Sequence, residues 1–539
     1  MVRKVLVAVI LGVLGYGLIR LFFPGNSSPA REPLAAMYGD DSILQRPPDS
    51  VMASAGPQYK LGKLGEFFLG KHYRSVWEVP VKAQVFHMSQ MEGGLQIEKL
   101  GGGMQTTSLT LTDSLGRRFA LRSLDKDPIS VLPPFWRRTF VGDLVRDQVS
   151  ATNPYAALVV APLAEAAGVF HTWPRLVYVM PSDQEFKSYA EQFGNKLFLM
   201  EEKFTTKASL SQAFGDATDV LDTKDVLQRR YQASTHHIDQ WAFAKARLLD
   251  LVISDWDRHE GQWDWAEYRQ GKEVWYKPIP KDRDQALCRY DDGVIPWLAS
   301  RRFAARKFES FHPQYNDVFG LTINAAFLDA RALPEVTLID FKRLARELQR
   351  ALTDEVLQKA ARQLPPPVYA LVGDDTYQTL RSRVRLLPQA AEEYYKILAQ
   401  EVSVVGSDEP ERFVIKRLSQ GRTAVEVYRL APRSTNGARI YSRTFFATET
   451  QKIRLYGLGG DDVFEISGQV EEGITLTLWG GTGKNRVTDT SLVPGWRKKT
   501  VIRPSQGGEM LVHGSEETEN KSRNEVQARD SFIRFRPDK

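Results

Sequence analysis

The sequence predicts an α+β protein in which a mixed region of strands and helices precedes an all-β domain. Two observations support this division. Strand and helix patterns alternate along residues 61–404, whereas strand-like runs such as RFVIKRL, AVEVYRL and ITLTLWGG dominate residues 405–500. The length of 539 residues also exceeds what one hydrophobic core usually holds, so several domains are expected.

Composition and charge narrow the classes of protein. The 72 basic and 66 acidic residues leave a net charge of +6, which is too small over this length to indicate a nucleic-acid partner. Cys288 is the only cysteine, and this excludes an intrachain disulfide and a zinc site built from several thiolates.

The N-terminus carries an apolar run behind two basic residues. Arg3 and Lys4 precede the uncharged stretch from Val5 to Ile19. We predict that residues 1–23 form a transmembrane signal anchor, with a cleaved signal peptide and a secreted form as the alternative. The basic residues would stay in the cytoplasm, so we expect a single-pass inner-membrane protein whose bulk is periplasmic.

The rest of the chain divides by composition and pattern, and no long-period repeat is evident. The predicted parts are a Pro-, Ser- and Gly-rich linker (24–60), a strand-rich N-terminal lobe (61–204), a helix-rich C-terminal lobe (205–404), a β domain (405–500) and a polar tail (501–539).

Three consecutive strands are predicted over residues 90–124. Gly101, Gly102 and Gly103 separate the first two strands, and a turn at 113–116 joins the second to the third. A glycine turn can pass close over phosphates without Cβ clashes. The third strand carries Arg122 and then Lys126, and either could pair with phosphates.

The stretch SDWDRHEGQWDW, residues 254–265, follows a predicted helix over 236–253 and raises the question of a catalytic loop. Asp257 could accept or orient the proton of an attacking hydroxyl. Gln262 is an amide at the spacing where a kinase signature has its metal-binding Asn. After the next strand, PKDRDQAL supplies Asp282 and Asp284. Because Mg²⁺ prefers hard oxygen ligands, Gln262, Asp282 and Asp284 are metal-ligand candidates.

The order of these parts resembles a protein-kinase-like fold, and the words DWDRHEGQ and DRDQA resemble the atypical kinases of the CotH, Fam20 and HipA types. The resemblance covers about residues 70–400. It implies a bilobal domain that uses ATP with Mg²⁺ or Mn²⁺, with Asp257 as catalytic acid/base and Arg122 or Lys126 on the phosphates. Glu201 and Glu202 end a strand in the place of the hinge that would bind adenine through its backbone.

The words GGG.QT and DWDRH also resemble a poorly characterised family of bacterial envelope proteins. Asp143, Asp147 and Glu165 compete as the helix acid that would hold the third-strand cation. Two functions stay open. One is a membrane-anchored atypical kinase acting on an envelope acceptor. The other is a catalytically inactive scaffold that docks envelope proteins through an adhesive β domain.

Two glycine-rich stretches mark the β domain: GLGGDDVFEI (457–466) and GGTGKNRVTD (480–489). They resemble the calcium-binding nonapeptide, which would make Asp461, Asp462 and Asn485 ligands of Ca²⁺. Tight turns in a β-sandwich or a short β-helix are the favoured interpretation. Trp256, Trp263 and Trp265 are expected to be packing residues.

Overall fold

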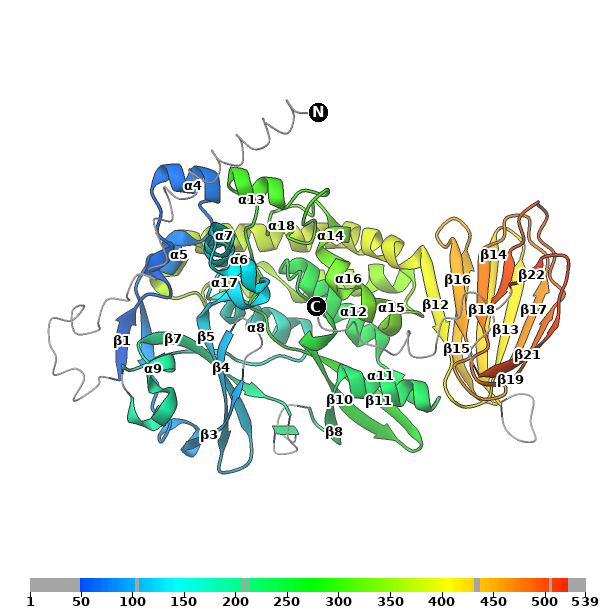
Figure 1. Ribbon diagram of the computed structural model, residues 1–539, viewed down its shortest axis with the longest axis horizontal. Helices are drawn as coiled ribbons and strands as arrows, with labels where there is room; N and C mark the ends of the chain where they lie inside the picture. The colour runs from blue at the N-terminus through cyan, green and yellow to red at the C-terminus, as the bar shows by residue number, and fades with distance from the viewer. Residues whose placement is uncertain are drawn as a thin grey trace.

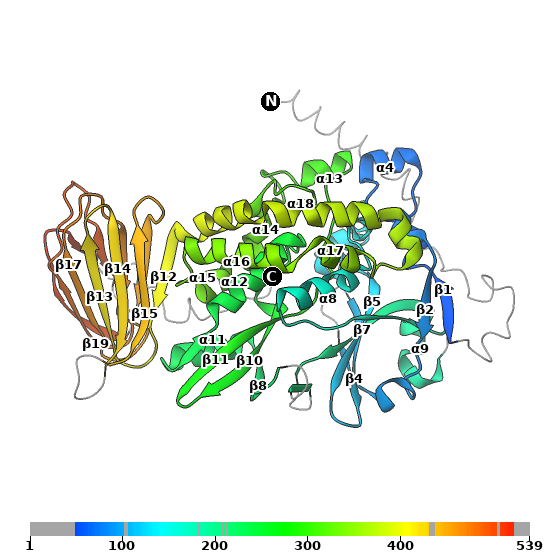
Figure 2. The same cartoon turned by 180° about the vertical axis from the view of Figure 1, so that it is seen from behind.

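The computed structural model describes residues 49–101, 106–181, 183–205, 209–210, 214–430, 437–503 and 507–521. The predicted anchor, Gly102 and Gly103 lie outside these ranges. In the described part of the chain, no helix is both long enough and apolar enough to cross a membrane. Over the described residues, the protein is an elongated mixed α/β molecule with four sheets, and its β-rich module forms one end (Figures 1 and 2).

The N-terminal lobe is built on a seven-stranded sheet of order β1-β2-β6-β7-β5-β4-β3. Its strands are β1 (Ser50–Ala53), β2 (Val81–Val85), β3 (Leu95–Gly101), β4 (Thr106–Asp113), β5 (Arg118–Lys126), β6 (Arg175–Val179) and β7 (Lys196–Lys203). The predicted strand–turn–strand order over 90–124 is confirmed, because β3, β4 and β5 pair antiparallel in succession. Residues 50–59 were expected to be linker. They form β1 and a 3-10 turn instead, because Val51, Ala53 and Tyr59 are buried.

Side-chain alternation gives this sheet two different faces. One face buries Leu109 of β4, Leu121 of β5 and Phe198 of β7 in a common core. Arg122 and Leu199, which lie opposite each other in register, face the other way together with Glu201. The second face of β5 and β7 therefore presents charged groups toward the C-terminal lobe.

Several short helices follow β5 in the chain. They are α6 (Pro134–Arg137), α7 (Phe140–Asp147) and α8 (Ala156–Ala167), preceded in the chain by α4 (Lys63–Leu69) and α5 (Arg74–Glu78) and followed by α9 (Ala190–Phe193). Gly168 ends α8 with φ = 64°, a left-handed C-cap.

The C-terminal lobe combines helices with a four-stranded sheet of order β8-β10-β11-β9. Its elements are β8 (Asp219–Asp222), α11 (Thr223–Gln232), β9 (His236–Ile238), α12 (Gln240–Val252), β10 (Trp263–Gln270), β11 (Glu273–Pro280), α13 (Val294–Ala299), α14 (Val318–Thr322), α15 (Ala326–Ala332), α16 (Leu338–Ala351), α17 (Asp354–Ala361) and α18 (Pro366–Ala399). The helix predicted over 236–253 is α12, and it begins at Gln240, four residues after the predicted start. His236–Ile238 pair with β11, and Asp239 then caps α12 by accepting from the backbone N–H of Ala242 at 3.0 Å.

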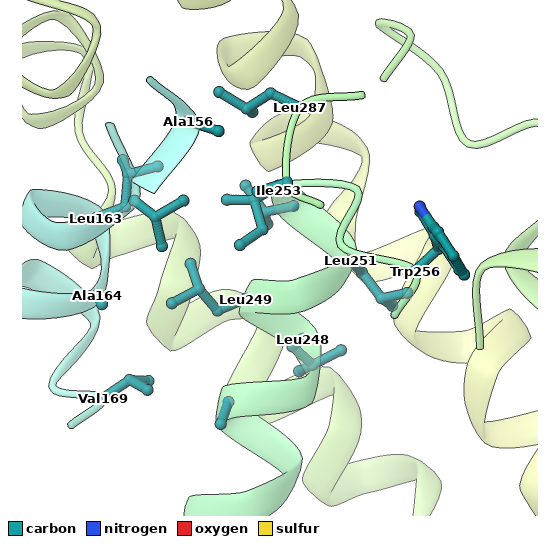
Figure 3. Close-up of a cluster of buried hydrophobic side chains, with 14 of the residues drawn as sticks. Ala156, Leu163, Ala164, Val169, Leu248, Leu249, Leu251, Ile253, Trp256 and Leu287 are labelled. Carbon is teal, nitrogen blue, oxygen red and sulfur yellow. The ribbon is translucent and has the colours of Figure 1, made fainter. Parts of the chain in front are cut away.

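A single large core joins the two lobes, and α12 lies at its centre. Leu249 and Ile253 point toward Leu163 of α8, with Leu287 beside them (Figure 3). Each such side chain contributes roughly 1.5–3 kcal/mol when fully buried. This packing fixes the end of α12, from which residues 254–262 continue.

The β domain is a two-sheeted solenoid of mostly parallel strands. Its strands are β12 (Glu401–Val405), β13 (Glu411–Leu418), β14 (Arg422–Arg429), β15 (Arg439–Phe446), β16 (Lys452–Tyr456), β17 (Val463–Gly468), β18 (Thr475–Trp479), β19 (Gly483–Asp489), β20 (Thr500–Arg503), β21 (Gly508–His513) and β22 (Thr518–Asn520). One sheet has the order β12-β16-β18-β20-β22, and the other has the order β15-β14-β13-β17-β19-β21.

Successive coils of the solenoid stack in register. Lys452 lies opposite Thr475, and Val463 lies opposite Arg486, so one coil here takes 23 residues. No long-period repeat was predicted from the sequence, where this period shows only in alternating inward residues and in the glycine-rich turns that begin at residues 457 and 480. Strands β20, β21 and β22 extend the solenoid to Asn520, past the boundary predicted at residue 500. Half of the residues of β21 are exposed, and that polarity made the segment resemble a tail.

Polar contacts bind the solenoid to the C-terminal lobe. The Arg429 guanidinium donates to Glu273 at 2.7 and 2.8 Å and to the carbonyl of Ser234 at 2.7 Å. Tyr441 and Arg443 both donate to the carbonyl of Pro334. The hydrogen bonds to Arg429 hold the pKa of Glu273 at about 2, well below its ordinary value.

Candidate active site

Residues 254–262 form a loop with an irregular backbone between α12 and β10. Ser254 opens it with φ = 55°, in the left-handed region that non-glycine residues seldom adopt. The Asp257 carboxylate is half-buried and accepts from the Asn324 side-chain amide at 3.1 Å. Asn324 belongs to the 3-10 turn Ile323–Ala325, and nothing in its local sequence pattern signalled this contact.

Trp256, Trp263 and Trp265 are buried, which confirms them as packing residues. Trp263 and Trp265 pack against Phe243 of α12. The tryptophan side chains of residues 254–265 therefore pack on the buried side of the loop, and Asp257 and Gln262 remain partly exposed.

Arg258 ties this loop to the segment that follows β11. Its buried guanidinium donates to the carbonyl of Lys281 at 2.8 Å and to that of Gln262 at 3.0 Å. The same group lies over the Trp263 ring, 4.6 Å from the centroid. Asp250 at 3.4 Å and Asp255 at 3.6 Å balance its charge. Arg258 thereby fixes the position of Gln262 relative to residues 281–282.

A buried ionic network continues beneath the loop. Arg283 forms an ion pair with Asp250 and lies 3.2 Å from Asp255. Burial raises the pKa of Asp255 although Arg258 and Arg283 oppose it. For Asp250, the arginines outweigh the burial and lower the pKa. These acids hold the loop in place and lie below the partly exposed surface that carries Asp257.

Gln262 and Asp282 meet in space. The backbone N–H of Lys281 donates to the Gln262 carbonyl at 3.1 Å, which places Gln262 beside the segment of Asp282, and Asp282 has φ = 58°. Burial opposes ionisation of the Asp282 carboxyl, but Arg122, Lys126 and Arg258 together lower its pKa. Asp282 is therefore an anion at neutral pH, as a metal ligand must be.

The two candidate cations of β5 each contact a different candidate metal ligand. Arg122 donates to Glu201 at 2.5 Å and lies 3.7 Å from Asp282, while Lys126 forms an ion pair with Asp284. Burial lowers the pKa of the Lys126 ammonium, as does Arg122, whereas Asp282 and Asp257 raise it. The third strand and the two loops thus converge on one point between the lobes.

Glu201 holds Arg122, a role for which the sequence offered three helix acids. Thr172 donates to the second oxygen of Glu201 at 2.7 Å and orients it. Asp147 is instead paired with the buried Arg74, both oxygens accepting at 2.7 Å, and Glu165 is exposed. Cross-strand pairs between residues so distant in sequence give no local signal.

The residues predicted to contact nucleotide are placed as follows. Gly101 ends β3 opposite Ser108, next to Arg122 in the sheet. Glu202 faces away from Arg122 because it lies opposite Phe119 of the core face. Among the described strands, β7 pairs with β6 only as far as Met200 but with β5 as far as Lys203. The backbone at 201–202 therefore has one strand neighbour and one open edge.

The donor set fits a divalent cation that also takes phosphate oxygens. Asp282 and Asp284 offer carboxylates, and Gln262 offers an amide oxygen. Within the described ranges, no group of three or more His, Cys, Asp or Glu could hold a metal alone. Mg²⁺ commonly binds through one or two carboxylates, with water and phosphate oxygens as its other ligands, and does not need a site made of protein ligands alone. The few oxygen ligands here suit that mode of binding.

The calcium candidates of the β domain lie at stacked turns. Asp461 accepts from the backbone N–H of Lys484 at 2.7 Å, and Asp462 accepts from that of Glu411 at 2.8 Å. Asn485 accepts from the N–H of Asp462 at 3.1 Å. Each side chain links neighbouring coils, as the tight-turn interpretation requires.

No family model matches the sequence, and no curated protein matches it. Solved structures give remote similarities. The proinflammatory kinase CtkA of Helicobacter pylori shares 15% identity over 56% of this chain and 96% of that chain, with a TM-score of 0.30. The toxin–antitoxin protein complex HipA–HipB with operator DNA from Shewanella oneidensis MR-1 gives 11% identity over 57% of this chain and 67% of that chain, with a TM-score of 0.24.

Proposed function

We propose that this protein is an atypical kinase that transfers a phosphoryl group from a magnesium–nucleotide complex to a hydroxyl acceptor. The observation that supports it is the convergence of Gln262, Asp282 and Asp284 with Arg122 and Lys126 between the lobes. Phosphoryl transfer depends mainly on positioning and charge neutralisation, and this cluster supplies cations for phosphates and oxygens for Mg²⁺.

Each residue then has a distinct task. Arg122, held by Glu201, and Lys126 bind the phosphates, and Asp282, Asp284 and Gln262 would hold Mg²⁺, which would neutralise further charge. Asp257 accepts the proton of the acceptor hydroxyl as that oxygen bonds to phosphorus, while the nucleoside diphosphate leaves. Asn324 keeps one oxygen of Asp257 engaged and so orients the other. A membrane anchor at the N-terminus and an envelope acceptor complete the proposal.

A catalytically silent scaffold is the second candidate, and one observation favours it. Arg122 and Lys126 already neutralise Asp282 and Asp284, so the site is electrostatically satisfied by the protein alone. In that case these residues would form a structural joint, and the solenoid would bind a protein partner.

Two measurements on the full chain separate these functions. Magnesium–ATP should raise the melting temperature, and label should pass from the γ-phosphate of ATP to protein. Asp284→Ala should lose both effects, while Asp257→Asn should keep the thermal shift and lose at least about a hundredfold in transfer. Asp461→Asn, an exposed acid in the solenoid, is the control and should retain both. If the wild type shows no thermal shift and no incorporation of label, the kinase proposal is wrong and the scaffold function is favoured.

A further inference from the structure

Two short helices at one edge of the protein turn apolar side chains outward. α4 and α13 pack against each other beside the long helix α18 (Figures 1 and 2). Leu64 and Phe67 of α4 are 63% and 61% exposed, and Trp297 and Leu298 of α13 are 46% and 47% exposed. Large apolar side chains gathered in this way on a soluble surface mark an interaction site.

The spacing along α13 shows that the outward face is a coherent stripe. Val294, Trp297 and Leu298 follow one another at intervals of three and one residues, which places them on one face of α13, and Arg301 lies just past the end of the helix. In most surface helices this stripe packs on the core, but here Pro296 is buried and the stripe is exposed. We call Leu64, Phe67, Val294, Trp297, Leu298 and the following Phe303 the α4–α13 patch; Phe303 is 80% exposed.

Close backbone contact keeps the two helices together. A Cβ built on Gly293, the N-cap of α13, would lie 2.2 Å from the backbone nitrogen of Gly70, the C-cap of α4. Asp292 also accepts from the backbone N–H of His72 at 2.6 Å. The two apolar faces are therefore presented as one surface.

Basic residues surround the patch. Lys63 and Lys71 flank α4, and Arg302 follows α13, and all three are exposed. Arg301 lies over the Trp297 ring at 4.2 Å and donates to the Trp297 carbonyl at 3.1 Å, which holds its cation beside the aromatic surface. Tryptophan with lysine and arginine around it is typical of surfaces that sit at a lipid headgroup layer.

We propose that the α4–α13 patch docks this edge of the protein onto an anionic lipid bilayer. The aromatic and aliphatic side chains would enter the interface, and Lys63, Lys71, Arg301 and Arg302 would contact lipid phosphates. The charge favours an anionic bilayer as the occupant, because basic residues around an apolar patch complement the negative surface potential of such a bilayer. This proposal is independent of the phosphoryl-transfer proposal, since none of these residues belongs to the candidate active site.

The test uses the full chain reconstituted in phosphatidylcholine vesicles with and without phosphatidylglycerol. An environment-sensitive fluorophore is attached to Trp297→Cys or Phe67→Cys; native Cys288 is fully buried and does not compete for label. Trp496→Cys is the matched control, because Trp496 is 85% exposed in the solenoid. Because the N-terminal apolar run would affect vesicle attachment equally in every labelled variant, the difference between positions does not depend on it.

We expect spin-labelled lipid to quench the fluorophore at positions 297 and 67 several times more strongly than at 496. Removing phosphatidylglycerol, or introducing Arg301→Glu with Arg302→Glu, should reduce this difference. Equal quenching at all three positions would overturn the proposal. A blue shift at 297 that appears without lipid and grows with protein concentration would also overturn it, and would assign the patch to a second copy of the chain.

Discussion

Removal of Arg258 should separate the two segments that build the candidate active site. Its guanidinium is fully buried, donates to the carbonyls of Gln262 and Lys281, and balances Asp250 and Asp255. Arg258→Ala leaves these carboxylates with one cation fewer, and breaking a buried pair on one side costs about 3–5 kcal/mol. A loss of this size should lower the melting temperature by several degrees.

The conservative variant separates charge from geometry. Arg258→Lys keeps the cation but cannot donate to two carbonyls as a planar fork does. Losing one such charge-assisted hydrogen bond costs about 1.5–3 kcal/mol, so this variant should lie between wild type and Arg258→Ala. Arg118→Ala is the control: Arg118 forms a surface ion pair with Glu98, and its loss should cost less than about 1 kcal/mol.

Urea unfolding followed by tryptophan fluorescence is the assay, because Trp263 lies beneath the Arg258 guanidinium. The thermal shift by magnesium–ATP is measured in parallel and should fall in both Arg258 variants, since Gln262 and Asp282 lose their fixed spacing. An Arg258→Ala protein that unfolds at the wild-type midpoint and keeps its nucleotide response would show that Arg258 does not hold the two segments together.

Three further predictions concern the solenoid. Burial and then Glu411 raise the pKa of Asp462 from 3.8 to about 9. The stability that the protonated carboxyl provides is complete below pH 3.8 and is lost as pH rises toward about 9, so the melting temperature should decline over this range. Asp462→Asn should flatten this decline. Gly481→Ala should lower the melting temperature, because Gly481 has φ = 85° and the new Cβ would lie 2.2 Å from a carbonyl oxygen. Arg429→Ala should speed limited proteolysis between the C-terminal lobe and the solenoid, because it removes the hydrogen bonds to Glu273; an unchanged cleavage rate would show that other contacts suffice.

Local signals in the sequence predict much of the fold but little of the cross-chain pairing. The hairpin of β4 and β5 follows from alternation and a turn, and the end of α8 follows from Gly168. His236 was expected in a helix because the residues after it are helical and strongly apolar, yet it pairs with Val274 in a parallel strand. Such pairing depends on a partner that no local window contains.

The candidate site shows the same limit. Asp257, Gln262 and Asp282 could be selected from the sequence, because residue type and spacing carry their chemistry. Neither Arg258 nor Asn324 was identified from the sequence. Their roles depend on carbonyl and carboxylate groups that tertiary packing brings together.

The stacking of the solenoid has a consequence for its length. Neighbouring coils contact each other mainly through parallel strand pairing, so another coil could be added at the far end without disturbing the lobes. Strands in a sheet are spaced by about 4.8 Å, and each added coil would move the tip outward by that amount. The length of the solenoid can therefore change in fixed increments while the candidate active site stays the same.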